Sequence, residues 1–162
     1  MFIAQPKRVY SLKKLQLYGS KNYNANYEWP KSLADLGDDV RKFKDLKVKT
    51  VWYQKGSGTT GDIRFELNNG KTSEAICGHL NSAKEKLELD QEKRLKCVKM
   101  LENDNCFNQF EFIYDDGKSV LTTKYYERKE WREQEIKENQ VLVGCYGYKS
   151  GDYFYSIGLI VL

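Results

Sequence analysis

The chain has 162 residues, of which 40% are hydrophobic, and its 27 Lys and Arg against 23 Asp and Glu give a formal net charge of +4. This length suits one domain with an appendage and a core that closes without disulfides or metal. No apolar run approaches the roughly 18 residues of a membrane span, and the N-terminus lacks the apolar segment and cleavage site of a secretory signal. We therefore expect a cytoplasmic protein.

The first 28 residues form a basic, aromatic arm. Five basic residues there stand against Glu28, whereas the remaining 134 residues hold 22 basic and 22 acidic side chains. The arm also has apolar anchors, so we expect it to be held by its own domain or by a protein partner with an acidic surface. The predicted partner-binding residues are Lys7, Arg8, Tyr10, Lys13, Lys14, Leu15, Leu17 and Tyr18.

From residue 46 onward, a unit recurs three times at a spacing of 47 residues. Each copy alternates apolar with more polar residues, as a strand buried on one face does. Asn69-Gly70 and Asp116-Gly117 follow two of these strands and predict tight hairpin turns. The equivalent apolar positions are Ile63, Phe110 and Ile157; Phe65, Phe112 and Leu159; and Leu67, Tyr114 and Val161.

A second apolar strand precedes each of these strands. The segments LKVKTVWY, KRLKCVKM and NQVLVGCY begin at Leu46, Lys93 and Asn139. Three sheets that cannot each bury an apolar face alone can do so around a threefold axis. For the charged stretch in residues 125–138 we expect an exposed loop, with a helix of i,i+4 charge pairs as the alternative.

The threefold unit resembles the jacalin-type lectin family. The segment LVGCYGYKSGDYFYSIGLIVL is similar to the family's closing strands, with glycines at Gly144, Gly147, Gly151 and Gly158. KLELDQEKRLKCVKML and GDIRFELNNGKT are similar to earlier hairpins of the family. The resemblance covers about residues 29–162 and implies an all-β protein, a β-prism of three four-stranded Greek-key sheets with threefold pseudo-symmetry. It also implies that an N-terminal strand completes the third sheet, a role for which DDVRKFKDLKVKT is our candidate.

The resemblance also implies where a sugar would bind. Jacalin-type lectins hold a monosaccharide with a Gly-x-x-x-Asp loop, in which a carboxylate and backbone amides contact hydroxyl groups. The aligned loop here runs from Gly151 through Asp152 and Tyr153 to Tyr155, so tyrosine stands at the Asp position. This departure predicts a vestigial site. Gly58 to Asp62 fits the pattern as written, although Asp62 aligns with Ser156 rather than Tyr155.

Catalytic and metal-binding patterns are not evident in the sequence. His79 is the single histidine, and with Cys77 it supplies two ligands where a zinc site needs three or four. No nucleophile elbow or phosphate loop is present. Cys77, Cys97, Cys106 and Cys145 form no C-x-x-C pair and are expected to be buried free thiols. We expect no enzyme, no cofactor and no metal.

Two functions fit these observations. The first is a non-enzymatic, jacalin-like binding module that acts as an intracellular structural or assembly subunit through protein contacts, with a large assembly or a filament such as a microtubule as the possible partner. The second is an active carbohydrate-binding lectin, using Gly58, Asp62, Gly151, Asp152, Tyr153 and Tyr155. Nucleic-acid binding is not favoured, because five positive charges spread over 28 residues offer few phosphate contacts.

Overall fold

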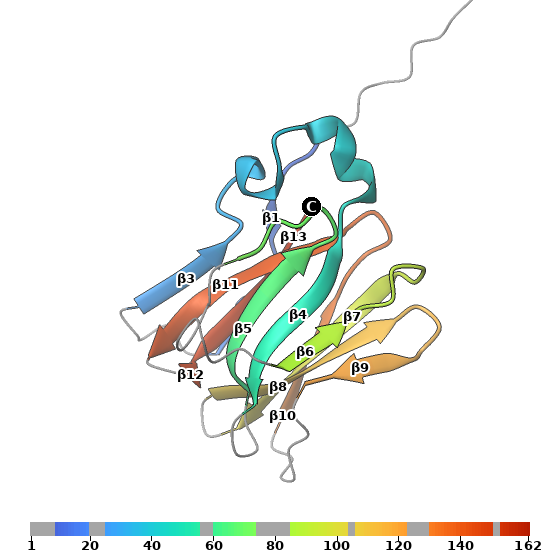
Figure 1. Ribbon diagram of the computed structural model, residues 1–162. Coiled ribbons are helices and arrows are strands. Elements are labelled where there is room, and N and C mark those ends of the chain that lie inside the picture. The colour runs from blue at the N-terminus through green and yellow to red at the C-terminus, as the bar shows by residue number, and fades with distance from the viewer. Residues whose placement is uncertain are drawn as a thin grey trace, which may run out of the picture.

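The three predicted hairpins are present in the computed structural model (Figure 1), which describes residues 9–19, 25–55, 60–73, 85–103, 106–122, 130–150 and 153–162. Each hairpin is antiparallel and contains two strands of the repeat. The repeat therefore predicts the inner part of every sheet. The hairpins are β4 (Val48–Lys55) with β5 (Thr60–Leu67), β7 (Leu95–Asn103) with β8 (Cys106–Tyr114), and β11 (Leu142–Ser150) with β13 (Ser156–Val161).

The strand register repeats along with the sequence. Each hairpin pairs equivalent residues across its strands, and each has a bulge at the same place. Gly70 and Gly117 adopt φ of 88° and 85°, as the predicted turns require. The repeated pairs are Val51 with Phe65, Val98 with Phe112 and Cys145 with Leu159. The bulges lie between Val48 and Thr50, Leu95 and Cys97, and Leu142 and Gly144.

Outer strands complete the first two sheets. β6 (Glu85–Glu88) pairs with β4, and the fourth position of the first sheet holds a single bridge between Glu66 and Thr72. In the second sheet, β9 (Ser119–Leu121) pairs with β8 and β10 (Glu130–Glu135) pairs with β7. The short strand β12 (Tyr153–Phe154) pairs with both β11 and β8, and so joins the second sheet to the third.

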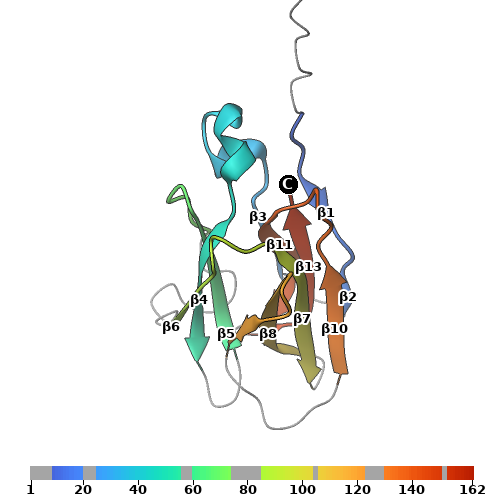
Figure 2. The same ribbon diagram turned by 90° about the vertical axis from the view of Figure 1, so that its right-hand side faces the viewer.

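The third sheet takes its outer strands from the N-terminal segment. β1 (Lys13–Lys14) and β2 (Tyr18–Gly19) pair with β13, and β3 (Ala25–Trp29) pairs with β11. Figure 2 shows β1 and β2 beside β13, on the side of the molecule that faces β10. The two ends of the chain therefore build one sheet.

Two sequence predictions are corrected by this arrangement. The boundary between residues 28 and 29 falls inside β3, so the described part of the arm belongs to the prism. DDVRKFKDLKVKT does not complete the third sheet, because it forms the 3-10 helix η2 (Val40–Asp45) and the start of β4. The backbone N–H of Arg41 donates to Asp39 at 3.0 Å and starts that helix. A second 3-10 helix, η1 (Leu33–Leu36), precedes it at the upper end in Figure 1.

The loop predicted for residues 125–138 is also wrong in its described part. Residues 130–135 form strand β10, which pairs with β7 from Glu130–Glu102 to Glu135–Cys97. Its sequence, EWREQE, is charged because it is an outer strand, where charged side chains oppose edge-to-edge association. Such a composition hides the apolar alternation by which strands are recognised. Residues 125–129 lie outside the described residues.

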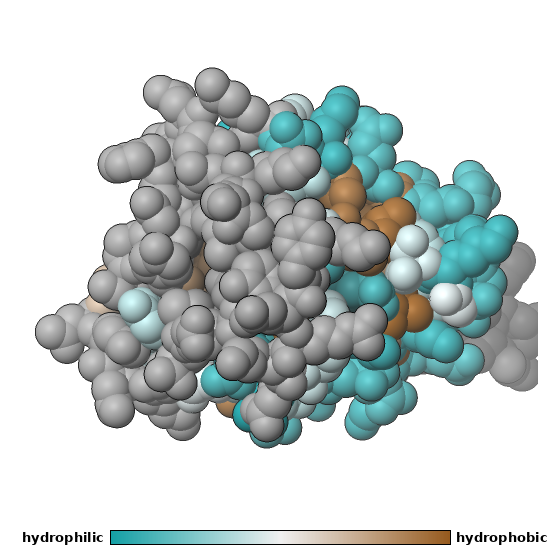
Figure 3. All heavy atoms as spheres, turned by 90° about the horizontal axis from the view of Figure 1, so that it is seen from below, coloured by the Kyte–Doolittle hydropathy of each residue, from teal (hydrophilic) through white to brown (hydrophobic). Residues whose placement is uncertain are grey.

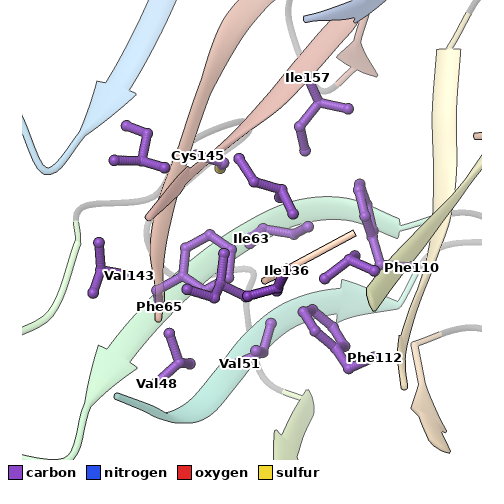
Figure 4. Close-up of a cluster of buried hydrophobic side chains, with 14 of the residues drawn as sticks. Val48, Val51, Ile63, Phe65, Phe110, Phe112, Ile136, Val143, Cys145 and Ile157 are labelled. Atoms are coloured by element: carbon purple, nitrogen blue, oxygen red, sulfur yellow. The ribbon is translucent and has the colours of Figure 1, made fainter. Parts of the chain in front are cut away.

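The core lies between the three sheets. Ile63, Phe110 and Ile157 are 1%, 2% and 1% exposed, and side chains from all three hairpins point toward one another in Figure 4. All three equivalent positions are buried, so the predicted register is confirmed. Phe154 extends the cluster, with its ring 6.0 Å from that of Phe110. The threefold apolar repeat thus forms a single shared core.

Candidate functional site

The strand ends that flank three equivalent hairpin connections gather at one end of the prism. These ends border residues 56–59, 104–105 and 151–152, and they lie at the lower end in Figure 1. Figure 3 views this end, where described side chains are mostly hydrophilic with a few hydrophobic ones between them. This end contains the loops for which the sequence predicts sugar binding.

The third-sheet loop is held closely by its own chain. Gly151 and Asp152 lie outside the described residues, but Ser150 pairs with Tyr153 and Lys149 with Phe154 on either side of them. Phe154 is completely buried, and its ring is 5.6 Å from that of Tyr27. The middle of the predicted sugar loop is therefore anchored in the core.

Tyr155 is half-buried, and its backbone is engaged within the protein. Its N–H donates to the carbonyl of Tyr148 at 3.0 Å, and the N–H of Tyr148 donates to Ser156 Oγ at 2.9 Å. A Cβ atom at Gly19 would meet the carbonyl oxygen of Tyr155, so β2 packs directly against the end of the loop. This amide is not free to bind a sugar hydroxyl, and no carboxylate stands at position 155.

The first-sheet loop departs from the family pattern in another way. Gly58 lies outside the described residues, and the backbone of Asp62 belongs to strand β5. In the first sheet Lys55 pairs with Thr60, and at the equivalent place in the third sheet Lys149 pairs with Phe154. The two hairpins therefore keep the same register up to the loop. Asp62 thus occupies the place of Ser156, as the spacing predicts, and not that of Tyr155.

The predicted partner-binding side chains lie on the prism itself. Lys7 and Arg8 lie outside the described residues. Of the others, Tyr10 meets the ring of Phe43 edge-on at 5.7 Å, and Leu15 and Tyr18 pack against the core. Leu17 is half-buried, Lys13 is exposed, and Lys14 forms an ion pair with Glu28. Tyr10, Leu15 and Tyr18 thus pack on the arm's own domain, which was one of the two alternatives left open by the sequence.

A hollow lies at the other end of the prism, opposite the predicted sugar loops, where the linkers between sheets meet. Its volume is about 1290 Å³, and two cations of its lining, Arg94 and Lys93, are engaged within the protein. Arg94 Nη1 donates to the carbonyl of Ile136 at 2.9 Å, and Lys93 is 2.8 Å from Asp116. The hydrogen bond from Lys93 lowers the pKa of Asp116 below its usual value. Both contacts join a linker residue to another part of the chain.

The described cysteines are buried free thiols, as predicted. Cys97 and Cys145 are both buried, and burial raises the pKa of Cys97 to about 12, aided by a hydrogen bond to Glu133. Neither is suited to nucleophilic chemistry, which requires a thiolate. Cys77, His79 and the side chain of Cys106 lie outside the described residues. Within the described part of the chain, no cluster of three metal-ligating side chains occurs, and no helix is long and apolar enough to span a membrane.

One group of residues was missed by the sequence predictions. On the outward face of the first sheet, Trp52 pairs across the strands with Arg64 on one side and Lys86 on the other. The 47-residue spacing places Trp52 in register with Lys99 and Tyr146. The different residue types at these equivalent positions could have pointed to this group from the sequence. We name Arg64, Trp52 and Lys86 the cationic row.

No family model matches the sequence, and no curated protein resembles it. Solved structures share its fold. A lamprey immune protein has a TM-score of 0.66 and 13% identity over 94% of this chain and 45% of that protein, so the chain spans less than half of the lamprey protein. Artocarpin, in a complex with mannotriose, has a TM-score of 0.62 and 15% identity over 95% and 99% of the two chains. Frutapin, a lectin from Artocarpus incisa, has a TM-score of 0.62 and 16% identity over the same shares. The expected jacalin-type β-prism fold is thereby confirmed.

Proposed function

We propose that this protein is a non-enzymatic carbohydrate-binding module whose family monosaccharide loop is vestigial. The observation that carries the proposal is the match in fold to complete single-domain lectins, such as artocarpin, which was solved with mannotriose. The match covers 95% of this chain and 99% of artocarpin. A fold can host several functions, so the details of the loops must decide how a glycan would be bound.

Both candidate loops lack the carboxylate at the expected place. The third-sheet loop has Tyr155 there, and the N–H of this residue is bonded to the Tyr148 carbonyl. The first-sheet loop has its carboxylate at Asp62, in the register of a buried serine, Ser156. A glycan would therefore have to be recognised outside these two motifs.

A glycan array probed with the full chain tests this proposal. We expect binding to at least one class of glycan, and the same pattern for Asp62→Ala and Tyr155→Phe. Loss of binding in Asp62→Ala would show that the first-sheet loop is active, and would contradict its being vestigial. Silence across neutral and anionic glycans would overturn carbohydrate binding altogether.

A second candidate is a structural or assembly subunit that binds another protein. The observation that favours it is the same departure of both loops from the sugar-binding pattern, since a prism without a working loop still offers three sheet faces. Silence on the array, together with a stable complex recovered with a purified partner, would support this function. In that case the partner would contact a sheet face, because the described arm residues pack on the prism.

A further inference from the structure

Equivalent positions on the outward faces of the three sheets carry different chemistry. Residues directly opposite across antiparallel strands share a face, and the neighbours Val51, Val98 and Cys145 point into the core. The intervening residues therefore face outward. The three equivalent rows are Arg64, Trp52 and Lys86 in the first sheet; Glu111, Lys99 and Glu133 in the second; and Gly158, Tyr146 and Glu28 in the third.

In the second and third sheets the charges of the row are compensated locally. Lys99 lies between two glutamates, one on each neighbouring strand. In the third sheet Lys14 lies 5.2 Å from the centre of the Tyr146 ring and forms an ion pair with Glu28. Lys99 in the second row and Lys14 beside the third row therefore each have a carboxylate of their own chain nearby.

The cationic row of the first sheet is different. The Arg64 guanidinium carbon is 5.3 Å and the Lys86 Nζ is 5.7 Å from the centre of the Trp52 ring. Lys86 is 3.2 Å from Glu88, in a pair whose side chains are more than half exposed, and exposed pairs of this kind are weak. Two cations thus flank one aromatic ring, and among the described residues only Lys86 has an ion pair, the exposed one with Glu88.

Arg64 carries the stronger signal. Within the described part of the chain it has no ion pair, and its Nε is buried with no hydrogen-bond acceptor. A buried N–H without an acceptor is costly, and such groups are uncommon in folded proteins. A guanidinium is also the group that binds carboxylate and sulfate in a fork of two hydrogen bonds. The described protein supplies no acceptor for this donor, and an anion is the kind of group that a guanidinium binds most strongly.

The neighbouring row restricts where an anion can lie. Glu66 and Glu88 flank Thr50, one row farther from the loop end of the prism. Their carboxylates repel an anionic group on that side, whereas the row itself lies toward the connection between β4 and β5. A ligand would thus enter from the loop end and run onto the sheet face.

We propose that the outward face of the first sheet binds an anionic glycan, with Arg64 and Lys86 taking its sulfate or carboxylate groups and Trp52 contacting a sugar ring. This rests on the carbohydrate binding proposed above, and assigns it a substrate class and a place. Three adjacent strands span about 10 Å, which suits a short oligosaccharide better than a protein interface of roughly 800 Å² per partner. A nucleic acid is disfavoured because its affinity grows with the number of phosphates neutralised, and this row offers two cations.

The test uses the full chain and a heparin-derived hexasaccharide, with affinity measured by calorimetry. We expect Arg64→Gln and Lys86→Gln to weaken binding about tenfold each, as loss of a charge-assisted hydrogen bond does. Lys99→Gln, the equivalent position in the second sheet, should leave affinity unchanged. Arg64→Lys keeps the charge but loses the Nε donor, so we expect a smaller loss of affinity than in Arg64→Gln. This variant takes the place of Arg64→Gln if that one does not fold.

Equal affinity in Arg64→Gln and the original chain would overturn the proposal, as would an equal loss in Lys99→Gln. Polyglutamate binding as tightly as the hexasaccharide, with the same dependence on Arg64, would show a general acidic-protein surface and also overturn it. Failure here is distinguishable from failure of the proposed function. If neutral glycans bind on the array and Arg64→Gln binds them equally well, the proposed carbohydrate binding stands. The cationic row is then not the glycan site.

Discussion

The first and third sheets have the same inner face but are built from different parts of the chain. The strands of the first sheet, β4, β5 and β6, lie in one stretch from Val48 to Glu88. The third sheet combines N-terminal strands with a C-terminal hairpin. At positions 144 and 158 the third sheet has glycine where the first sheet has side chains, since a Cβ at Gly144 would meet the carbonyl of Trp29 and a Cβ at Gly158 would meet the ring of Tyr146. The chain's own N-terminus thus extends the third sheet and places Lys14 and Glu28 beside Tyr146, whereas the equivalent row of the first sheet keeps Arg64 with no ion pair among the described residues.

The strongest test of this comparison is to delete residues 1–28. The deletion removes β1, β2 and most of β3, and with them the buried hydrogen bond that Tyr27 Oη donates to the Ser156 carbonyl at 2.7 Å. We expect the cooperative thermal transition to disappear, because β13 loses β1 and β2 and β11 loses most of β3, so the third sheet keeps none of its N-terminal outer strands intact. Lys13→Ala, which alters an exposed side chain of the same segment, should keep the original midpoint. A truncated chain that unfolds cooperatively at the original temperature would show that the third sheet does not need these strands.

Truncation of the shared core should have the next largest effect. Phe110 is 2% exposed and lies where side chains of the three sheets meet. Phe110→Ala should lower the free energy of unfolding by about 3–5 kcal/mol, through lost burial and the cavity left behind. Urea denaturation measures this loss, with Val40→Ala, at a 49% exposed side chain, as the control within about 0.5 kcal/mol. A change below about 1 kcal/mol at Phe110 would contradict a core common to all three sheets.

A smaller effect compares the two sheets at one repeated position. Thr50 and Gly144 are equivalent, but a Cβ at Gly144 would collide with the carbonyl of Trp29, which belongs to β3. Gly144→Ala should therefore cost about 3 kcal/mol, because backbone must move to admit a methyl group. Thr50→Ala in the first sheet should cost about 1 kcal/mol, the usual scale of a substitution that removes only a few atoms from a small buried side chain. Equal costs in urea denaturation would mean that β3 does not cover the third sheet as described.

The smallest expected change is at the third-sheet loop. Tyr155→Asp restores the family's carboxylate, yet the N–H of residue 155 stays bonded to the Tyr148 carbonyl. We expect no affinity for mannose up to millimolar concentration in calorimetry. Millimolar or tighter binding would show that a missing carboxylate alone had silenced the loop, and would revive the third sheet as the sugar site.

The sequence predicted the parts of the fold that depend on the repeat. Ile63, Phe110 and Ile157 indicate the core, because apolar alternation that recurs at a fixed period is typical of repeated units that bury a common face. β1 and β2 were beyond this reasoning, since two-residue strands show no periodicity and owe their place to pairing with β13. β10 was missed because an outer strand of charged residues has the composition of a loop.

The candidate site was predictable only in part. The sequence located both loops of the Gly-x-x-x-Asp type and the substitution at Tyr155. It did not show that the Tyr155 amide is bonded to Tyr148, which depends on how β12 folds back. The cationic row also depends on the register in which β6 pairs with β4. The 47-residue spacing does not give this register, so Lys86 could not be placed beside Trp52 from the sequence.

The most direct test of the contrast between the two sheets is a nuclear magnetic resonance titration of the full chain with the heparin-derived hexasaccharide. Among the three tryptophan indole signals, that of Trp52 can be assigned with Trp52→Phe. We expect this signal and the amide signals of Arg64 and Lys86 to shift, while the amide signals of Tyr148 and Tyr155 stay in place. Shifts confined to Tyr148 and Tyr155, or none in either sheet at saturating ligand, would contradict it.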